Sequence, residues 1–232
     1  ITATSAGDTN YNPAVTSTLI TISKGTPTLS LTSTSTNLAV NTSATATAVS
    51  LPAGVGTISS TGSISYSILS TSGGGSATIH VNTGFVMALN SGSVTIQALQ
   101  ASDANYNAVS ATLVINIGAG VQALSFSSAS YTLLTNQIQT ITATNSVSNG
   151  GAITYSITAG SGSATVNANT GQITATGAGT ITLTAFAAAN SNYNASSTSV
   201  LITINSSTPT LSLSPTLAAN ALRVDQGATI TA

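Results

Sequence analysis

The chain has 232 residues, of which 41% are hydrophobic and 2% are charged, and its formal net charge at pH 7 is −1. Nucleic-acid binding is excluded, because neutralising phosphates requires clustered Lys and Arg and the chain has only two such residues. A membrane-spanning helix is excluded as well, because the sequence contains no run of about 20 apolar residues.

A recurring tripeptide marks the chain as a tandem repeat. It occurs as Asn10-Tyr11-Asn12, Asn105-Tyr106-Asn107 and Asn192-Tyr193-Asn194, so the tyrosines are 95 and 87 residues apart. The motif Thr-Pro-Thr-Leu-Ser-Leu begins at Thr26 and again at Thr208, an offset of 182 that equals the sum of those intervals. A repeat of about 90 residues is too long for a solenoid unit and has the size of one sandwich domain.

Apolar residues that alternate with Thr and Ser, as in 153–157 and 181–185, predict half-buried strands. The Asn-Thr-Gly triplets that end at Gly84 and Gly171 predict tight hairpins, in which Gly supplies the positive φ. Seven or eight short strands at regular spacing indicate an all-β fold of tandem immunoglobulin-like antiparallel β-sandwich domains arranged head to tail. In the best-preserved repeat, strands are expected near 122–126, 129–134, 138–144, 152–158, 163–168, 171–175, 179–186 and 197–204.

The repeat pattern divides the chain into four segments. Residues 1–23 match the C-terminal strands of a preceding immunoglobulin-like repeat, and 206–232 match the N-terminal strands of a following one. The segments 24–117 and 118–205 are each expected to be a whole immunoglobulin-like repeat. We therefore expect a segment of a longer repetitive chain.

Three features together resemble the bacterial immunoglobulin-like repeats of large surface and secreted proteins. They are a strand that begins with Gly, as in 92–98 and 179–185, the Asn-Tyr-Asn turn, and the Ile-x-Ile strand that closes each unit. This resemblance implies an extracellular or cell-surface location and a role in spacing, adhesion or assembly. It does not imply catalysis.

The tyrosines of the repeated tripeptide, Tyr11, Tyr106 and Tyr193, are candidate structural residues. We expect each to cap one end of a sandwich, with the ring on the core and the hydroxyl bonded to a nearby backbone group, as in a tyrosine corner. A row of tyrosines facing a ligand is the alternative, because equivalent positions on successive domains would form a periodic stripe.

Asp8 and Asp103 precede two of these tyrosines and are weak candidates for Ca²⁺ ligands. Each site offers one carboxylate, whereas Ca²⁺ takes six to eight oxygens, usually from several carboxylates. The aligned residue of the third unit is Asn190, which keeps the capacity to cap a turn and removes the charge. An Asx turn is therefore the favoured role, and no metal or other cofactor is predicted.

The sequence predicts no catalytic residues. His80 is the only histidine, it aligns with Asn167 of the next repeat, and we expect it on the outward side of a strand. The many Ser and Thr residues lack the base and orienting acid that nucleophilic catalysis requires, so we do not expect an enzyme.

Two functions fit this composition. In the first, the array is a structural part of an extracellular fibre, sheath or surface layer and binds copies of itself, because few charges are available to prevent association. In the second, the repeats form the stalk or the binding modules of a bacterial cell-surface adhesin. Direct binding of carbohydrate or a host surface is the weaker version, since Trp, a common platform for sugars, is absent.

Overall fold

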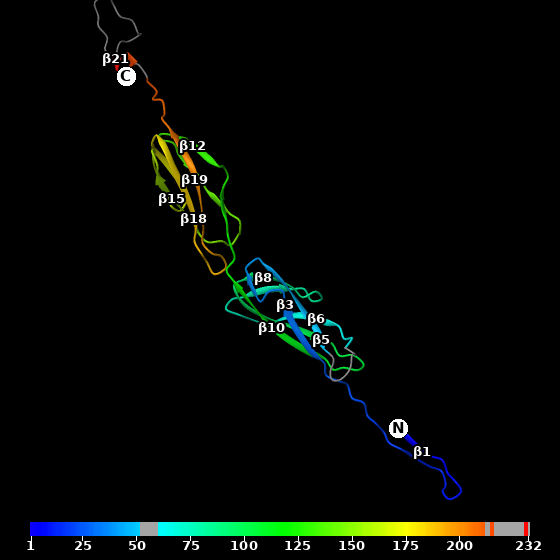
Figure 1. Ribbon diagram of the computed structural model, residues 1–232. Coiled ribbons are helices and arrows are strands. Elements are labelled where there is room, and N and C mark those ends of the chain that lie inside the picture. Colours follow the sequence, from blue (N-terminus) through cyan, green and yellow to red (C-terminus); the bar gives the residue numbers. More distant parts are fainter. Residues whose placement is uncertain (52–59, 212–213, 216–229, 232) are drawn as a thin grey trace, which may run out of the picture. The chain divides into compact units, whose positions relative to one another are not determined.

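The computed structural model describes residues 1–51, 60–211, 214–215 and 230–231, and in this part every regular element is a β-strand (Figure 1). The chain forms two compact units. One contains Ile1–Val121 with Ser191–Asn194, and the other contains Gln122–Asn190 with Ala195–Ala232. The predicted all-β fold is confirmed, and the described residues include no helix long and apolar enough to cross a membrane.

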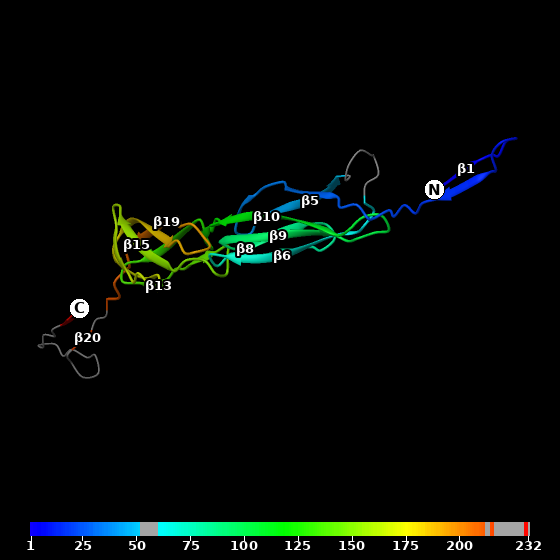
Figure 2. The ribbon, with the colours of Figure 1, turned by 90° about the horizontal axis from the view of Figure 1, so that it is seen from below.

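In the first unit, two four-stranded sheets make a sandwich, and a separate hairpin precedes it. The sheets have the orders β4-β10-β9-β6 and β3-β5-β8-β7, and β4 runs parallel to β10 while the other pairs are antiparallel (Figures 1 and 2). The hairpin is β1 (Thr2–Ser5) with β2 (Ala14–Ser17). The sandwich strands are β3 (Thr28–Ser33), β4 (Asn37–Ala39), β5 (Ser43–Leu51), β6 (Ile64–Ser72), β7 (Ser76–Ile79), β8 (Phe85–Asn90), β9 (Gly92–Gln100) and β10 (Val109–Gly118).

The hairpin has the register of the last two strands of the sandwich. Thr2 pairs with Ser17, as Gln97 pairs with Thr112 at positions 95 residues later. The interval between the first two tyrosines is also 95 residues. The same spacing therefore governs both the sequence motif and the strand pairing.

The second unit repeats this topology in three sheets. Their orders are β12-β19-β18-β15, β13-β17-β16 and β11-β14, and β12 runs parallel to β19. The strands are β11 (Leu124–Phe126), β12 (Ser130–Leu134), β13 (Ile138–Thr140), β14 (Ala143–Asn145), β15 (Ile153–Ala159), β16 (Ser163–Val166), β17 (Gln172–Gly177), β18 (Gly179–Ala187) and β19 (Ser196–Asn205). A short pair, β20 (Ser214–Pro215) with β21 (Ile230–Thr231), follows.

The strand positions predicted for this repeat agree with the structure within two residues at each end, with one correction. The strand expected over 138–144 is two strands, β13 and β14. The chain changes partner between them, because β13 pairs with β17 whereas β14 pairs with β11. At the break, the N–H of Ile141 donates to the carbonyl of Gly171 at 3.0 Å.

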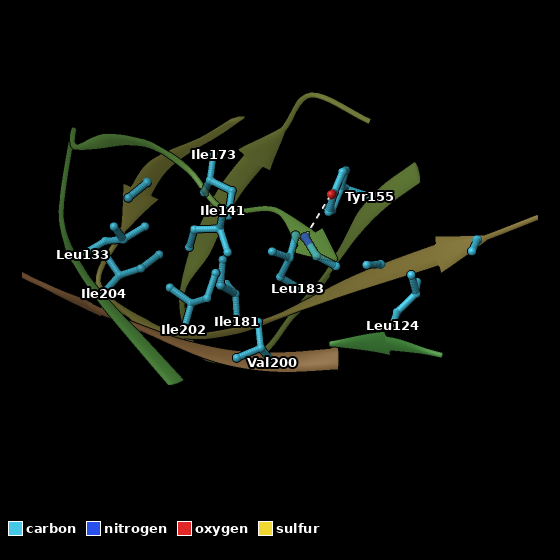
Figure 3. Close-up of a cluster of buried hydrophobic side chains, with 14 residues drawn as sticks. Leu124, Leu133, Ile141, Tyr155, Ile173, Ile181, Leu183, Val200, Ile202 and Ile204 are labelled. Atoms are coloured by element: carbon cyan, nitrogen blue, oxygen red, sulfur yellow. Dashed lines mark hydrogen bonds between the residues drawn. The ribbon is translucent and has the colours of Figure 1, made fainter. Parts of the chain in front are cut away.

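The core lies on the inward side of strands that alternate aliphatic and hydroxyl residues. On β18, Ile181, Leu183 and Ala185 are at most 1% exposed, while the Thr residues between them are partly exposed. The same alternation on β19 buries Ile202 and Ile204. Figure 3 shows the buried cluster that results. Ile141, in the loop between β13 and β14, also belongs to this cluster.

A buried tyrosine links the two halves of each core. The hydroxyl of Tyr155 on β15 accepts a hydrogen bond from the N–H of Ala143 on β14, at 3.0 Å (Figure 3). Tyr66 on β6 accepts the equivalent bond from the N–H of Ala48 on β5, at 2.9 Å. In both cases the bond joins strands of different sheets, and it satisfies a backbone donor that faces the core.

The glycine expected in each hairpin turn is confirmed. Gly84 and Gly171 have φ values of 68° and 69°. A Cβ at Gly84 would lie 2.2 Å from the carbonyl oxygen of Ala46, and one at Gly171 would lie 2.4 Å from that of Ile141. Both the backbone conformation and the close approach of another backbone segment therefore require Gly.

The segment boundaries 1–23, 24–117 and 118–205 stay predictions. The strands predicted for 206–232 fall largely outside the described residues, which in that range are 206–211, 214–215 and 230–231.

We predict that Tyr155→Phe lowers the free energy of unfolding of its sandwich by about 1–3 kcal/mol, because the buried N–H of Ala143 loses its acceptor. Tyr131→Phe is the matched control, since the hydroxyl of Tyr131 bonds only to the exposed hydroxyl of Ser127, at 2.9 Å. Its effect should stay within about 0.5 kcal/mol. Chemical denaturation measures both, and equal effects of the two substitutions would contradict the role of the buried bond.

Candidate functional site

The repeated Asp and Tyr residues form turns between strands. One carboxylate oxygen of Asp103 accepts hydrogen bonds from the N–H groups of Asn105 and Tyr106, both at 2.8 Å. Asp8 makes the same turn with Asn10 and Tyr11, at 2.7 and 2.8 Å. This is the geometry of an Asx turn, in which the side chain replaces a backbone acceptor.

The second carboxylate oxygen of Asp103 binds a different loop. It accepts bonds from the N–H of Thr61 at 2.7 Å, from the hydroxyl of Ser60 at 2.9 Å and from that of Thr61 at 3.2 Å. The hydrogen bond from the backbone of Asn105, followed by that from Thr61, holds the pKa of Asp103 well below its usual range. Asp103 therefore connects two loops of one sandwich as an ionised side chain.

These contacts occupy the oxygens that a cation would need. Both oxygens of Asp103 already accept from protein donors, and Asp8 uses one oxygen in its turn. Among the described residues no three His, Cys, Asp or Glu side chains gather in one place. The arrangement is suited to capping turns, and the expectation that neither residue binds a metal stays a prediction.

The three repeated tyrosines differ in burial. Tyr11 is 76% exposed, Tyr106 is partly buried and Tyr193 is 7% exposed. Tyr193 belongs to the same compact unit as Ile1–Val121, and its hydroxyl accepts a bond from the side-chain amide of Asn41 at 3.0 Å. The capping role expected of these tyrosines stays a prediction.

The backbone of the Asn-Tyr-Asn turn makes a contact that the sequence did not predict. The N–H of Gly25 donates to the carbonyl of Asn105 at 2.9 Å, and the N–H of Asn107 donates to the carbonyl of Gly25 at 2.8 Å. Gly120 exchanges the equivalent bonds with Asn192 and Asn194, at 2.8 and 3.0 Å. The recurrence of Gly at 25 and 120, an offset of 95 residues, was the signal that could have found this pairing.

His80 also caps a turn, which corrects its expected place on a strand. It follows the end of β7 and is exposed, and its Nδ1 accepts bonds from the N–H groups of Asn82 and Thr83, both at 3.3 Å. In the next repeat the side-chain oxygen of Asn167 accepts the equivalent bonds at 3.0 and 3.2 Å. The imidazole thus replaces an Asn side chain, which explains why these residues align.

The second sandwich offers little to acid–base chemistry. The segment 118–205 contains no Lys, Arg, Asp, Glu, His or Cys. Its ionisable side chains are therefore tyrosines, and the hydroxyl of Tyr155 lies in the core. What its surface offers to another molecule is hydroxyl, amide, aliphatic and aromatic groups, the last including Phe186.

We predict that stability falls below about pH 4 in the first sandwich and not in the second. A carboxylate whose pKa is lowered by folding stabilises the fold fully above the unfolded-state pKa, and this stabilisation is lost as the pH falls through the folded-state pKa. Calorimetry of the chain between pH 2 and pH 7 should show a pH-dependent transition for the first sandwich. The segment 118–205 has no carboxylate side chain and is the internal control.

Asp103→Asn should remove most of that pH dependence, because its side-chain amide carries no titrating charge. The single amide oxygen can accept from only one of the two loops, so this variant should also be less stable than the unmodified chain at neutral pH. An acid-sensitive transition that persists in Asp103→Asn would show that another group is responsible.

We predict that Tyr193→Ala destabilises the fold by roughly 3 kcal/mol or more, the usual cost of truncating a buried aromatic residue. Tyr106→Ala should cost less, because Tyr106 is only partly buried. Denaturant titration of both variants decides the order, and an unchanged midpoint for Tyr193→Ala would favour a ligand-facing role instead.

No protein-family model and no curated protein matches the sequence. Among solved structures, domains 4 and 5 of the S-layer protein SbsC are 13% identical over 78% of this chain and 99% of that chain, with a TM-score of 0.33. The insect immune protein hemolin is 13% identical over 88% of this chain and 55% of that chain, with a TM-score of 0.41. Drosophila N-cadherin EC1-4 is 17% identical over 73% of this chain and 47% of that chain, with a TM-score of 0.28. Identities and scores this low carry no information about a ligand or partner.

Proposed function

We propose that the chain is a non-catalytic structural repeat array of an extracellular fibre, sheath or surface layer, in which copies associate through uncharged β-sandwich surfaces. The extracellular location rests on the resemblance of the Gly-led strand, the Asn-Tyr-Asn turn and the closing Ile-x-Ile strand to bacterial surface repeats.

The observation that supports self-association most strongly is the lack of charge on a folded domain. Typical soluble domains carry about 25% charged residues, whereas the segment 118–205 has none. Charged side chains on surfaces and sheet edges are a common means by which soluble proteins avoid association. Copies of this sandwich can approach one another without electrostatic repulsion and without removing any charge from water.

The edge strands have the same character. The sheets β4-β10-β9-β6 and β12-β19-β18-β15 end in β6 and β15. Each of these strands pairs with one neighbour in its sheet, β9 or β18. Neither Ile64–Ser72 nor Ile153–Ala159 contains a charged residue or a Pro. Such edges lack two of the features that normally block the addition of another strand.

Part of each edge is covered by its own chain. The N–H of Tyr155 donates to the carbonyl of Ala168 at 2.9 Å, and that of Tyr66 donates to the carbonyl of Val81 at 2.9 Å. These bonds occupy a backbone group near the start of each edge strand. Sheet faces are therefore the more extensive surfaces for contact between copies.

Sedimentation velocity of the 232-residue chain tests this proposal. We predict association that grows with protein concentration and changes little between about 50 mM and 1 M salt, because the chain has only two cationic and three anionic side chains whose interactions salt could screen. It should also change little between about pH 5 and pH 9. Strictly monomeric behaviour under all these conditions would contradict self-association and favour an adhesin stalk, in which successive domains act as spacers.

A further inference from the structure

We propose that the outer face of one sheet in each sandwich is the surface by which two copies dock, and that the other sheet is not. The docking sheets are β4-β10-β9-β6 and β12-β19-β18-β15. Figure 1 labels β12, β19, β18 and β15 side by side, and Figure 2 labels β10, β9 and β6. This inference rests on the proposed self-association and identifies the surface responsible for it. The binding partner is a second copy of this chain.

Two exposed apolar residues recur at matching positions on these faces. Leu99 on β9 and Phe186 on β18 are both 45% exposed, and they are 87 residues apart, as Tyr106 and Tyr193 are. Val114 on β10 is 50% exposed, and Leu201, 87 residues later on β19, is 49% exposed. The two repeats thus present large apolar side chains to solvent at the same two positions and to a similar extent.

The opposite outer faces lack such a match. Their exposed apolar residues align with polar residues of the other repeat in every case, so these positions differ between the two sandwiches. Phe85 aligns with Gln172, Leu89 with Thr176, Val49 with Thr144, and Ile138 with Ser43. A contact used by successive repeats requires a surface that successive repeats share, and only the first pair of faces provides it.

Two further exposed apolar residues on these sheets do not recur: Leu134 on β12, 48% exposed, aligns with Ala39, and Leu69 on β6, 55% exposed, aligns with Thr158. The remaining outward positions are mostly polar and carry no charge. Ser and Thr occupy most outward positions of the four strands, and β4, β6, β9, β10, β12, β15, β18 and β19 contain no charged residue. Some of the hydroxyls already have partners within the face, as Thr184 and Ser199 do at 2.9 Å. Burying such a face therefore leaves fewer polar groups unpaired than its composition implies, and water can bridge the others.

The positions of the apolar pair suit a two-fold contact. Leu99 lies beside Ser110 and Val114 lies beside Thr95, so the two apolar side chains are four residues apart along neighbouring strands. They lie diagonally across the face, roughly 13 Å apart along the strand direction. When two copies pack face to face about a two-fold axis, Leu99 of each copy can contact Val114 of the other.

The area of one face is small, so a stable complex would need several such contacts along the tandem repeats. The four strands of either sheet together contain 31 residues. At about 3.3 Å per residue and about 4.8 Å between strands they cover roughly 500 Å² per face, or about 1,000 Å² for the two faces of one contact. This is close to the lower limit for a specific interface. One sandwich should therefore dock weakly, and tandem sandwiches that dock together should bind much more tightly.

The test compares two variants of the 232-residue chain with equal added charge. The docking-face variant carries Leu99→Asp, Val114→Asp, Phe186→Asp and Leu201→Asp. The control carries Val49→Asp, Phe85→Asp, Leu89→Asp and Ile138→Asp on the opposite faces. We expect association of the docking-face variant, measured by sedimentation velocity, to weaken at least tenfold, and association of the control to change less than threefold.

A second pair of variants tests contact between copies directly, and it does not require the fold to tolerate four substitutions at once. The chain has no cysteine, so Gln97→Cys, on β9 between the two apolar positions, introduces a single thiol at the centre of the docking face. Met87→Cys on β8 places one on the opposite outer face. A short bifunctional maleimide should link copies of Gln97→Cys into dimers and should leave Met87→Cys largely unlinked.

The outcomes separate the two proposals. If the unmodified chain associates and both Asp variants weaken this association equally, the assignment of the face is overturned and self-association stands. The same conclusion follows if only Met87→Cys is crosslinked. A monomeric unmodified chain would overturn the proposed function and this inference together. Circular dichroism checks that each Asp variant is folded. If one has lost secondary structure, crosslinking of Gln97→Cys and Met87→Cys decides which face is used.

Discussion

The alternation of aliphatic and hydroxyl residues along each strand is the constraint on which this structure depends. With no charged residue in 118–205 and no cysteine anywhere, the second sandwich has neither ion pairs nor disulfides to hold it together. Burial of the aliphatic side chains and hydrogen bonding of the backbone must suffice. The same alternation places Thr and Ser on the outside, so one sequence pattern determines both the core and the chemistry of the surface.

Single residues then fix how the two sheets and the loops meet. A tyrosine hydroxyl joins the sheets through a backbone N–H in each sandwich, as Tyr66 and Tyr155 show. A positive-φ Gly in each hairpin lets a neighbouring backbone segment approach closely. The first sandwich adds Asp103, whose ionised carboxylate connects two loops, whereas Asn190 stands at the aligned position of the second. A charged turn is therefore optional within the repeat.

Local pattern was enough to predict much of this fold. Period-two alternation located the strands of the second repeat, and the Asn-Thr-Gly triplets located the turns at Gly84 and Gly171, because both depend on neighbouring residues. The break between β13 and β14 was missed, since it arises when one strand changes partner, and the partners lie far away in the sequence. The pairing of Gly25 with the Asn-Tyr-Asn turn was missed for the same reason. Which apolar residues stay exposed likewise depends on register, which is why Leu99 and Phe186 were identified only from the structure.

Neutral sandwich faces can assemble where charged faces would repel one another, and electron microscopy of the concentrated chain is the sharpest test of this. We expect ordered lateral assemblies with a regular spacing, present alike at low and at high salt. Dispersed single particles at every concentration and salt level would contradict it.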